Sequence, residues 1–314
     1  MPLYLRVGEK FIGPGRVEEV RLGGEAGVPV KIVSGLTTGA KLFLVGGLRL
    51  GEKLSAALAQ EFVGALDPRH LHGVLFLVTR GTPTPPRKKS KAPPPVEDIG
   101  RFFPGKLKGE PAEQLAQAIF REVVAKSDFG IELRSAPEGW MTLPHVEANL
   151  SNTHVRRLCE AFGAGVVLDD PGPPRSLRRV ATEFGVPTIT YEVGSGGRSE
   201  KTALQEGLKG INGILANLRM MGAEIPWRGA PSVIQDPCWL VAKRGGRLDA
   251  LVQPGATLRA GEAIARIEGT ESIVAPGPVV VLSMSSARNV DAGVPVCQVA
   301  TALENNSHRN ATLV

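Results

Sequence analysis

The sequence has few cysteines and no long apolar run, which argues against a disulfide-rich secreted protein and against a membrane protein. Its 314 residues include three cysteines, which are far apart in the chain and form no CxxC motif. This spacing favours buried thiols in a reducing compartment over a disulfide framework. No apolar run approaches the ~20 residues that a membrane-spanning helix needs, and residues 1–13 carry charges in place of the apolar centre of a signal peptide. We therefore expect a cytoplasmic protein with no membrane partner.

Histidine and aromatic residues are also scarce. The chain has five histidines, so few imidazoles are candidates for metal ligands. Its net charge of +6 comes from 37 basic and 31 acidic residues, which is a small excess for this length. Because no basic face is interleaved with aromatic side chains, a solvated basic surface is favoured over a nucleic-acid interface. We expect no nucleic-acid partner.

The most informative stretch is KLFLVGGLRLGE at residues 41–52. Residues 42–45 are all apolar, which predicts a strand buried on both faces of a parallel sheet. Gly46 and Gly47 interrupt this strand, and a helical period of apolar residues begins after Glu52. Open α/β sheets place their sites at the carboxyl ends of such strands, and this strand end carries Arg49 and Glu52.

The chain divides into two predicted domains. Up to residue 225, strands alternate with helices, which predicts an α/β domain with a mixed, mainly parallel sheet flanked by helices. From 226 to 302, short β-type runs separated by Gly and Pro predict an all-β module, and 303–314 form a polar tail. The predicted strands of the first domain are 16–22, 28–33, 42–45, 73–79, 129–133, 164–168 and 187–193, and the predicted helices are 111–126, 152–162, 177–184 and 200–221.

Residues 80–109 are rich in proline and have no helical period. A loop of this length inside a compact domain is usually functional or disordered. Its centre holds a small basic cluster of Arg87, Lys88, Lys89 and Lys91. The favoured interpretation is a mobile, solvated loop, and the alternative is an anion clamp over the site.

Four motifs of the chain match, in order, those of one enzyme family. RLGE at 49–52 stands where that family has H-G-D-E or H-G-N-E, and DIGRFFPG at 98–105 matches D-L-N-R-x-F-P-G. ELRS at 132–135 stands where an acidic, an apolar, a His and a small residue are found, and TYEVGSGG at 190–197 matches the segment that carries a general-base Glu. With LPHV at 143–146 in support, the chain resembles the succinylglutamate desuccinylase/aspartoacylase family of zinc-carboxypeptidase-like deacylases.

The resemblance implies a carboxypeptidase-like α/β domain followed by a barrel-sandwich module akin to biotinyl and lipoyl domains. A carrier domain needs a lysine at the tip of one hairpin, and the segment between Ile267 and Ile273 has none. We therefore expect a lid or assembly module. The resemblance also implies a hydrolase of linear amide C–N bonds that uses zinc held by two His and one Glu.

Both implied histidines are arginine in this chain, Arg49 and Arg134, and Glu52 is the only retained ligand position. An arginine side chain has no available lone pair at neutral pH, and its charge repels a metal ion. We therefore expect no cofactor, zinc included. The resemblance assigns substrate binding to Arg101, to which we add Arg49 and Arg134. Glu192 occupies the general-base position and is expected to be idle without a metal-activated water.

The two arginines have two interpretations. In the favoured one they take the place of the metal and pair with Glu52 and Glu192, because zinc with its three ligands carries the same single positive charge as Arg49, Arg134 and Glu52 together. In the alternative, the pocket is vestigial and both side chains point to solvent. A zinc site built from His145 with Glu147 or His154 is not favoured, because these spacings fit no ligand motif.

The favoured function is that of a catalytically impaired relative, a pseudoenzyme. It binds an anionic ligand, such as a carboxylate or an acyl-amino acid, or acts as the partner subunit of an active relative. We expect either a homo-oligomer or a hetero-oligomer with an active relative. One alternative is an active deacylase of N-acyl amino acids with a non-standard metal site. The other is a structural assembly protein.

Overall fold

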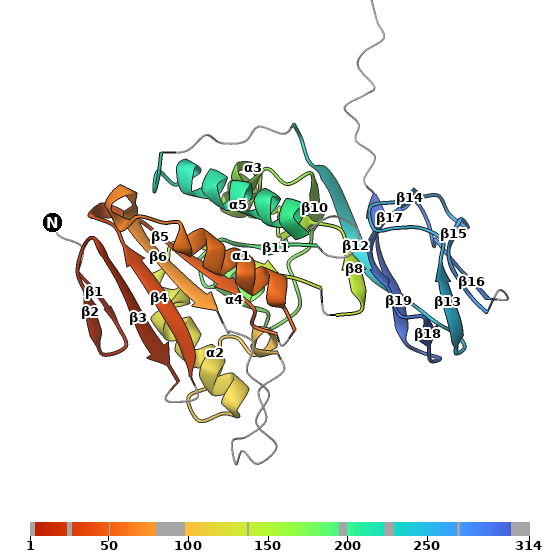
Figure 1. Cartoon of the computed structure of the whole chain (residues 1–314), viewed down its shortest axis with the longest axis horizontal. Coiled ribbons are helices and arrows are strands. Elements are labelled where there is room, and N and C mark those ends of the chain that lie inside the picture. Colours follow the sequence, from red (N-terminus) through yellow and green to blue (C-terminus); the bar gives the residue numbers. More distant parts are fainter. Residues whose placement is uncertain are drawn as a thin grey trace, which may run out of the picture.

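A computed structural model of the chain describes residues 4–23, 27–49, 51–79, 98–136, 138–194, 200–222, 229–268 and 271–302. The basic cluster predicted at 87–91 lies outside these residues. The described residues form an α/β domain that continues into a smaller β module (Figure 1). The overall fold class is therefore the predicted one.

The centre of the α/β domain is a set of parallel strands made by the apolar segments. β5 (Thr37–Gly46) pairs in parallel with β6 (His72–Thr79) and with β7 (Phe129–Arg134). β7 also pairs in parallel with β11 (Thr188–Glu192). The apolar parts of these strands are almost wholly buried, as expected for parallel strands that are covered on both faces. The carboxyl ends of β5, β7 and β11 meet at one edge of the sheet.

Antiparallel pairs complete the sheet on both sides. The predicted hairpin is present as β3 (Arg16–Leu22) and β4 (Val28–Ser34), and β4 joins the sheet through β6. On the far side, β9 (His145–Ala148) pairs antiparallel with β11 and parallel with β10 (Val166–Asp169). No pattern in the sequence predicted β9 as a strand, and it brings polar side chains next to β11.

Helices cover both faces of the sheet (Figure 1). One face packs against α1 (Lys53–Gly64), α3 (Thr153–Phe162) and α5 (Glu200–Asn217), and the other packs against α2 (Pro111–Glu122) and α4 (Leu177–Glu183). Short 3₁₀ turns are η1 (Pro68–His70), η2 (Ile99–Arg101) and η3 (Val124–Lys126).

Two helices end four residues before the predicted position. The helix predicted over 111–126 ends at Glu122, and η3 follows it as a separate turn. The helix predicted over 200–221 ends at Asn217, because Arg219 adopts a left-handed φ of 55°. Met220 then leaves the helical path and is fully buried in the core beneath α5.

The C-terminal module contains a separate four-stranded sheet, and its remaining strands extend the sheet of the α/β domain. β12 (Ser232–Val241) pairs with β10 through its first residues and with a module strand through the rest, so one strand belongs to both parts. The boundary predicted at 225/226 falls outside the described residues and stays a prediction. The other strands of the module region are β8 (Trp140–Thr142), β13 (Gly246–Ala250), β14 (Thr257–Leu258), β15 (Ala263–Ile267), β16 (Glu271–Val274), β17 (Val279–Ser285), β18 (Asn289–Val290) and β19 (Pro295–Ala302). The separate sheet has the order β16-β15-β13-β18.

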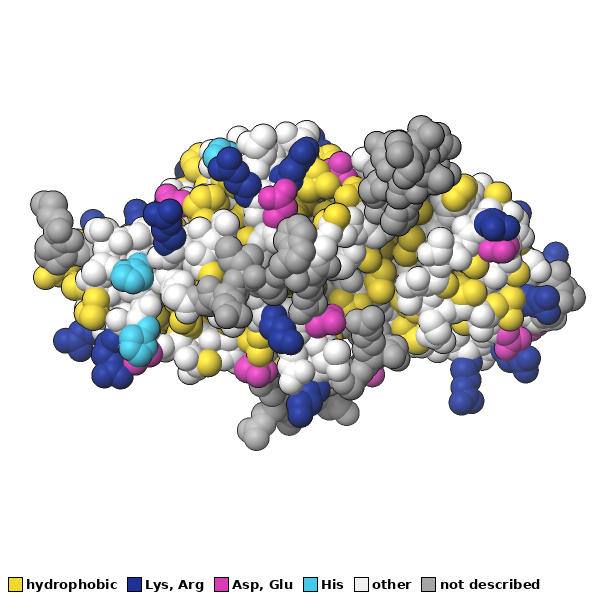
Figure 2. Space-filling view, turned by 90° about the horizontal axis from the view of Figure 1, so that it is seen from above, with side chains coloured by type: hydrophobic (Ala, Val, Ile, Leu, Met, Phe, Trp, Pro, Cys, Tyr) yellow, Lys and Arg dark blue, Asp and Glu magenta, His cyan; other side chains and the backbone are white. Residues whose placement is uncertain are grey.

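The charged side chains on the face shown in Figure 2 are scattered, with Lys and Arg interspersed among Asp and Glu. Charges arranged in this way form no continuous basic track on that face. Within the described part of the chain, no helix is both long and apolar enough to cross a membrane.

Glu122 joins the N-terminal hairpin of β1 (Leu5–Val7) and β2 (Lys10–Ile12) to the end of α2. It accepts hydrogen bonds from the backbone N–H of Gly8 at 2.8 Å and from Lys126 Nζ at 2.7 Å. Burial alone would raise its pKa, but these donors hold the pKa at about 2, below the usual 4.5. The carboxylate therefore stabilises the fold above pH 4.5, and this contribution is lost as the pH falls toward 2.

We expect Glu122→Gln to lower the free energy of unfolding by about 1–2 kcal/mol at pH 7. The difference from the wild type should shrink steadily between pH 4.5 and 2, because the wild-type carboxyl is then protonated as well. Urea denaturation at several pH values measures both effects. Glu9→Gln, which changes an exposed residue of the same hairpin, should show neither. A deficit that is constant with pH would refute the assigned role of the charge.

Candidate functional site

The site lies at the carboxyl edge of the parallel strands, where Arg49 and Arg134 meet Glu52. Arg49 Nη2 lies 3.2 Å from Glu52 Oε1, and Arg49 Nε donates to the same oxygen at 3.3 Å. Arg134 Nε lies 3.8 Å from that oxygen. Only 2% of the Glu52 side chain is exposed. The predicted pairing of both arginines with Glu52 is therefore confirmed, and neither guanidinium simply points to solvent.

The adjacent strands carry a polar ladder, by which we mean six polar residues on one sheet face. The first row places Glu192 of β11 in register with Arg134 of β7 and His145 of β9. The second row, two residues earlier along β11, is Thr190 with Glu132 and Glu147. Because side chains alternate along a strand, residues two apart share a face. The polar ladder therefore consists of Glu132, Arg134, His145, Glu147, Thr190 and Glu192.

The structure does not support the predicted pairing of Arg49 and Arg134 with Glu192. It is buried in register with Arg134, but within the described residues no ion pair joins it to either arginine. Its Oε1 is buried and has no hydrogen-bond partner in that same part of the chain. The prediction is therefore wrong for Glu192, because both guanidiniums contact Glu52 instead.

Arg101 stands at the rim of the site. It belongs to η2, and its Nε lies 3.2 Å from Asp98 Oδ2. The side chain of Arg101 is 77% exposed, so it is free to reorient toward an incoming ligand. A backbone bridge between Arg49 and Asp98 places η2 against the turn after β5. The sequence prediction that Arg49, Arg101 and Arg134 share one pocket agrees with their positions.

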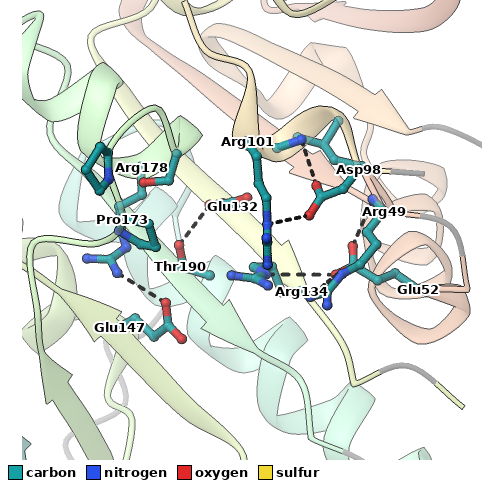
Figure 3. A pocket seen from close by; sticks show the side chains of 14 residues that line it. Arg49, Glu52, Asp98, Arg101, Glu132, Arg134, Glu147, Pro173, Arg178 and Thr190 are labelled. Carbon is teal, nitrogen blue, oxygen red and sulfur yellow. Dashed lines mark hydrogen bonds and ion pairs between the residues drawn. The ribbon is translucent and has the colours of Figure 1, made fainter. Parts of the chain in front are cut away.

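These groups surround a cavity of about 320 Å³ (Figure 3). Glu132 and Thr190 lie in its middle, between Arg178 on one side and Arg101 with Arg134 on the other. Thr190 Oγ1 donates to Glu132 Oε2 at 3.0 Å. The described lining residues are Leu48, Arg49, Glu52, Asp98, Gly100, Arg101, Glu132, Arg134, Glu147, Pro173, Pro174, Ser176, Arg178 and Thr190.

Arg178 is a lining residue that the sequence analysis missed. It projects from α4, and only 3% of its side chain is exposed. Its guanidinium lies 3.1 Å from Glu147 Oε2 and donates to the backbone carbonyl of Asp170. Glu147 also lies 3.8 Å from Nε2 of the buried His145, whose Nδ1 donates to the carbonyl of Leu143 at 2.8 Å. Polar residues alternating within buried strands were the signal that could have found Glu147.

Burial raises the pKa of Glu52 to about 7. The guanidiniums of Arg134 and Arg49 act in the opposite direction, and the nearby carboxyls of Glu192 and Glu132 add to the rise. Glu52 therefore titrates near neutral pH although it lies between two cations.

Burial also raises the pKa values of Glu132 and Glu192. By contrast, burial alone would raise the pKa of Glu147, but His145 and Arg178 hold it well below its usual range. The pKa of His145 is raised because the effect of Glu147 exceeds the cost of burying the charge. The pKa of Glu147 is thus lowered by the cations around it, whereas for Glu52, Glu132 and Glu192 burial outweighs the effect of the neighbouring cations.

The residues at the site do not fit a zinc ion. Zinc in catalytic sites takes three ligands from His, Cys, Asp or Glu and keeps an open position for water. Two of the positions are occupied by guanidiniums that already contact Glu52, and a guanidinium has no lone pair to donate. In the part of the chain that the structure describes, no three His, Cys, Asp or Glu side chains are arranged to hold a metal ion.

The fold and the strand-end site together define a carboxypeptidase-like α/β protein with a β module. A model of the succinylglutamate desuccinylase/aspartoacylase catalytic domain matches residues 38–218. The chain therefore belongs to the succinylglutamate desuccinylase/aspartoacylase family, whose members are deacylases of N-acyl amino acids.

Individual relatives agree with this assignment. The chain is 24% identical over 262 residues to the N-alpha-acetyl-L-2,4-diaminobutyric acid deacetylase of Halomonas elongata, covering 79% of this chain and 76% of that protein. The apo structure of the ectoine utilization protein EutE (DoeB) from Ruegeria pomeroyi has a TM-score of 0.78 at 18% identity, covering 96% and 99% of the two chains. A succinylglutamate desuccinylase/aspartoacylase from Rhodobacter sphaeroides has a TM-score of 0.74 at 18% identity, covering 92% and 95%.

Proposed function

We propose that this protein is a catalytically impaired member of its family that binds a carboxylate-bearing ligand, such as an acyl-amino acid, without zinc. The observation that carries the proposal is the contact of both Arg49 and Arg134 with Glu52. At this place the family resemblance implies two imidazoles and a metal ion. Guanidiniums instead supply fixed positive charge with several N–H donors, which suits a carboxylate and not a metal.

The charge balance of the cavity supports an anionic ligand. Four arginines line it together with Glu52, Asp98, Glu132 and Glu147, so the lining would be neutral if every group were ionised. Burial raises the pKa values of Glu52 and Glu132, which favours their neutral forms and leaves an excess of positive charge. A ligand carboxylate would restore the balance. The exposed Arg101 at the rim is the cation best placed to meet it first.

Hydrolysis is disfavoured by the same arrangement. In zinc-dependent hydrolysis the metal lowers the pKa of a bound water so that a neighbouring carboxylate can use it as a nucleophile. Glu192 stands at the general-base position, but among the described residues no set of His, Cys, Asp or Glu side chains is arranged to hold a metal ion that could activate a water for it. We infer that Glu192 takes no part in a reaction without a metal-activated water.

The test combines metal analysis with ligand binding. We expect the purified protein to contain far less than one equivalent of zinc by plasma mass spectrometry. N-alpha-acetyl-L-2,4-diaminobutyric acid, the compound named for the Halomonas elongata relative, serves as the binding probe in calorimetry and thermal unfolding. We expect saturable binding with no release of acetate.

Two arginine variants serve as the matched pair. Arg101→Met should weaken binding at least about tenfold, because a charged hydrogen bond is worth about 1.5–3 kcal/mol. Arg121→Met removes an exposed arginine of α2 outside the cavity and should leave binding unchanged. Stoichiometric zinc together with steady release of acetate would show an active deacylase instead. Absence of saturable binding would favour a purely structural role.

A further inference from the structure

The deep part of the cavity contains polar groups that the arginine cluster does not use. Glu132 is buried, and its Oε2 accepts the hydroxyl hydrogen of Thr190 at 3.0 Å. That bond leaves Oε1 as the oxygen that faces Gly100. Figure 3 places Glu132 and Thr190 in the middle of the cavity, between Arg178 on one side and Arg101 with Arg134 on the other.

Gly100 leaves space beside Oε1 of Glu132. Its φ is not left-handed, so the backbone does not require glycine there, and the consequence of the missing side chain is space. A Cβ at this position would lie 3.0 Å from Asp98 Oδ1, 3.7 Å from Glu132 Oε1 and 4.0 Å from Leu48 Cδ1. A side chain here would therefore contact Glu132 Oε1 and fill the space beside it.

Ser176 supplies a second, independent polar group. It is the N-cap residue of α4, but its side chain makes no capping hydrogen bond. Its Oγ is buried and has no hydrogen-bond partner in the described part of the chain, although the residue lines the cavity. A buried hydroxyl without a partner costs free energy unless a bound group satisfies it. Around Ser176, the charge of Arg178 is already matched by Glu147.

We propose that Gly100, Glu132 and Ser176 form a second subsite, which binds an uncharged carbonyl or carboxamide group of the ligand whose carboxylate is held by the arginines. This inference rests on the proposed function, because it assumes that a carboxylate enters the same cavity. The Glu132 carboxyl offers an O–H donor toward the space beside Gly100, and the Ser176 hydroxyl can donate or accept. The raised pKa of Glu132, caused by burial, agrees with a protonated donor.

The test compares small carboxylates of matched shape in calorimetric titrations of the full-length protein at pH 7. Succinamate carries a carboxamide at the end opposite its carboxylate, and 4-methylpentanoate has the same branched outline with no polar atom there. We expect succinamate to bind about tenfold more tightly. A third probe, 4-aminobutyrate, presents an ammonium group and should bind more weakly than succinamate.

Variants then test which residues cause the preference for succinamate over 4-methylpentanoate. Ser176→Ala and Gly100→Ala should each bring the ratio of the two affinities toward one, the first by removing a donor and the second by covering Glu132. Because the Ser176 hydroxyl caps nothing, Ser176→Ala should keep its unfolding temperature, so it remains informative even if Gly100→Ala perturbs η2. Ser232→Ala, at an exposed serine of β12, should keep the tenfold ratio.

The outcomes separate this inference from the proposed function. If all three probes fail to bind the wild type, the carboxylate site itself is wrong. If succinamate and 4-methylpentanoate bind equally well, the carboxylate site stands and the subsite is refuted. Tightest binding of 4-aminobutyrate would also refute the subsite, because it would mean that Glu132 acts as a carboxylate for a cation.

Discussion

Replacing Arg134 by methionine is expected to lower the free energy of unfolding by about 3 kcal/mol, because it removes a cation from among buried carboxyls. Arg134 lies 3.8 Å from Glu52 and in register with Glu192. Burial alone would lower the pKa of Arg134, but the surrounding carboxyls, Glu147 and Glu132 foremost, raise it, so the guanidinium stays charged. Without it, those carboxyls must either remain unbalanced or take up protons. Urea denaturation at pH 7 measures the loss.

Three comparisons make this prediction specific. Arg134→Lys keeps the charge and should lose less than half as much stability. Arg101→Met removes an exposed guanidinium and should change stability by no more than about 0.5 kcal/mol. In a double-mutant cycle with Glu52→Gln, the two losses should be non-additive by about 1 kcal/mol or more. Equal losses in Arg134→Met and Arg101→Met would show that the buried carboxyls do not depend on Arg134.

The second large effect is zinc binding, which we expect when the two histidines implied by the family resemblance are restored. In the double variant Arg49→His/Arg134→His, two imidazoles join Glu52, which completes a three-ligand set for zinc with an open fourth position. We expect the variant to bind one equivalent of zinc and the wild type to bind none. Zinc at about 100-fold its dissociation constant should then stabilise the variant by ~2.7 kcal/mol. Thermal unfolding with and without zinc, beside metal analysis, provides the measurement.

The two single variants and a displaced pair are the controls for the zinc prediction. Each single variant retains one arginine, whose charge opposes the ion, and should bind zinc at least about tenfold more weakly than the double variant. Arg49→His/Arg101→His places the second imidazole on η2, at an exposed rim position that the family resemblance does not give to a ligand, and should show no zinc-dependent stabilisation. Stoichiometric zinc in the wild type would overturn the proposal that the guanidiniums replace the metal.

Much of the α/β domain could be predicted from local patterns. The strands and helices around residues 41–64 were recognised because apolar runs and helical periods report burial directly. The meeting of Arg49 with Arg134 was also predictable, since β5 and β7 are neighbouring parallel strands whose carboxyl ends share an edge. Asn152 was expected at the start of a helix, and its side chain accepts from the N–H groups of His154 and Val155.

Other features could not be predicted, because they depend on which strand lies beside which. β9 enters between β10 and β11 with mixed direction, and nothing in its four residues specifies these partners. Its place in the sheet decides that His145 and Glu147 belong to the polar ladder. Similarly, Ser176 is the N-cap residue of α4, but nothing in the local sequence shows that its side chain makes no capping hydrogen bond.

The sequence by itself determined the class of fold, the family, and the replacement of two implied metal ligands by arginine, because these follow from residue types in consecutive positions. Only the tertiary structure decided that both guanidiniums converge on Glu52, that Glu192 is left without them, and that Glu132 lies open beside Gly100. The physical reason is that strand register and side-chain direction arise from long-range packing. A pattern along the chain reports burial, but it does not report which buried charges meet.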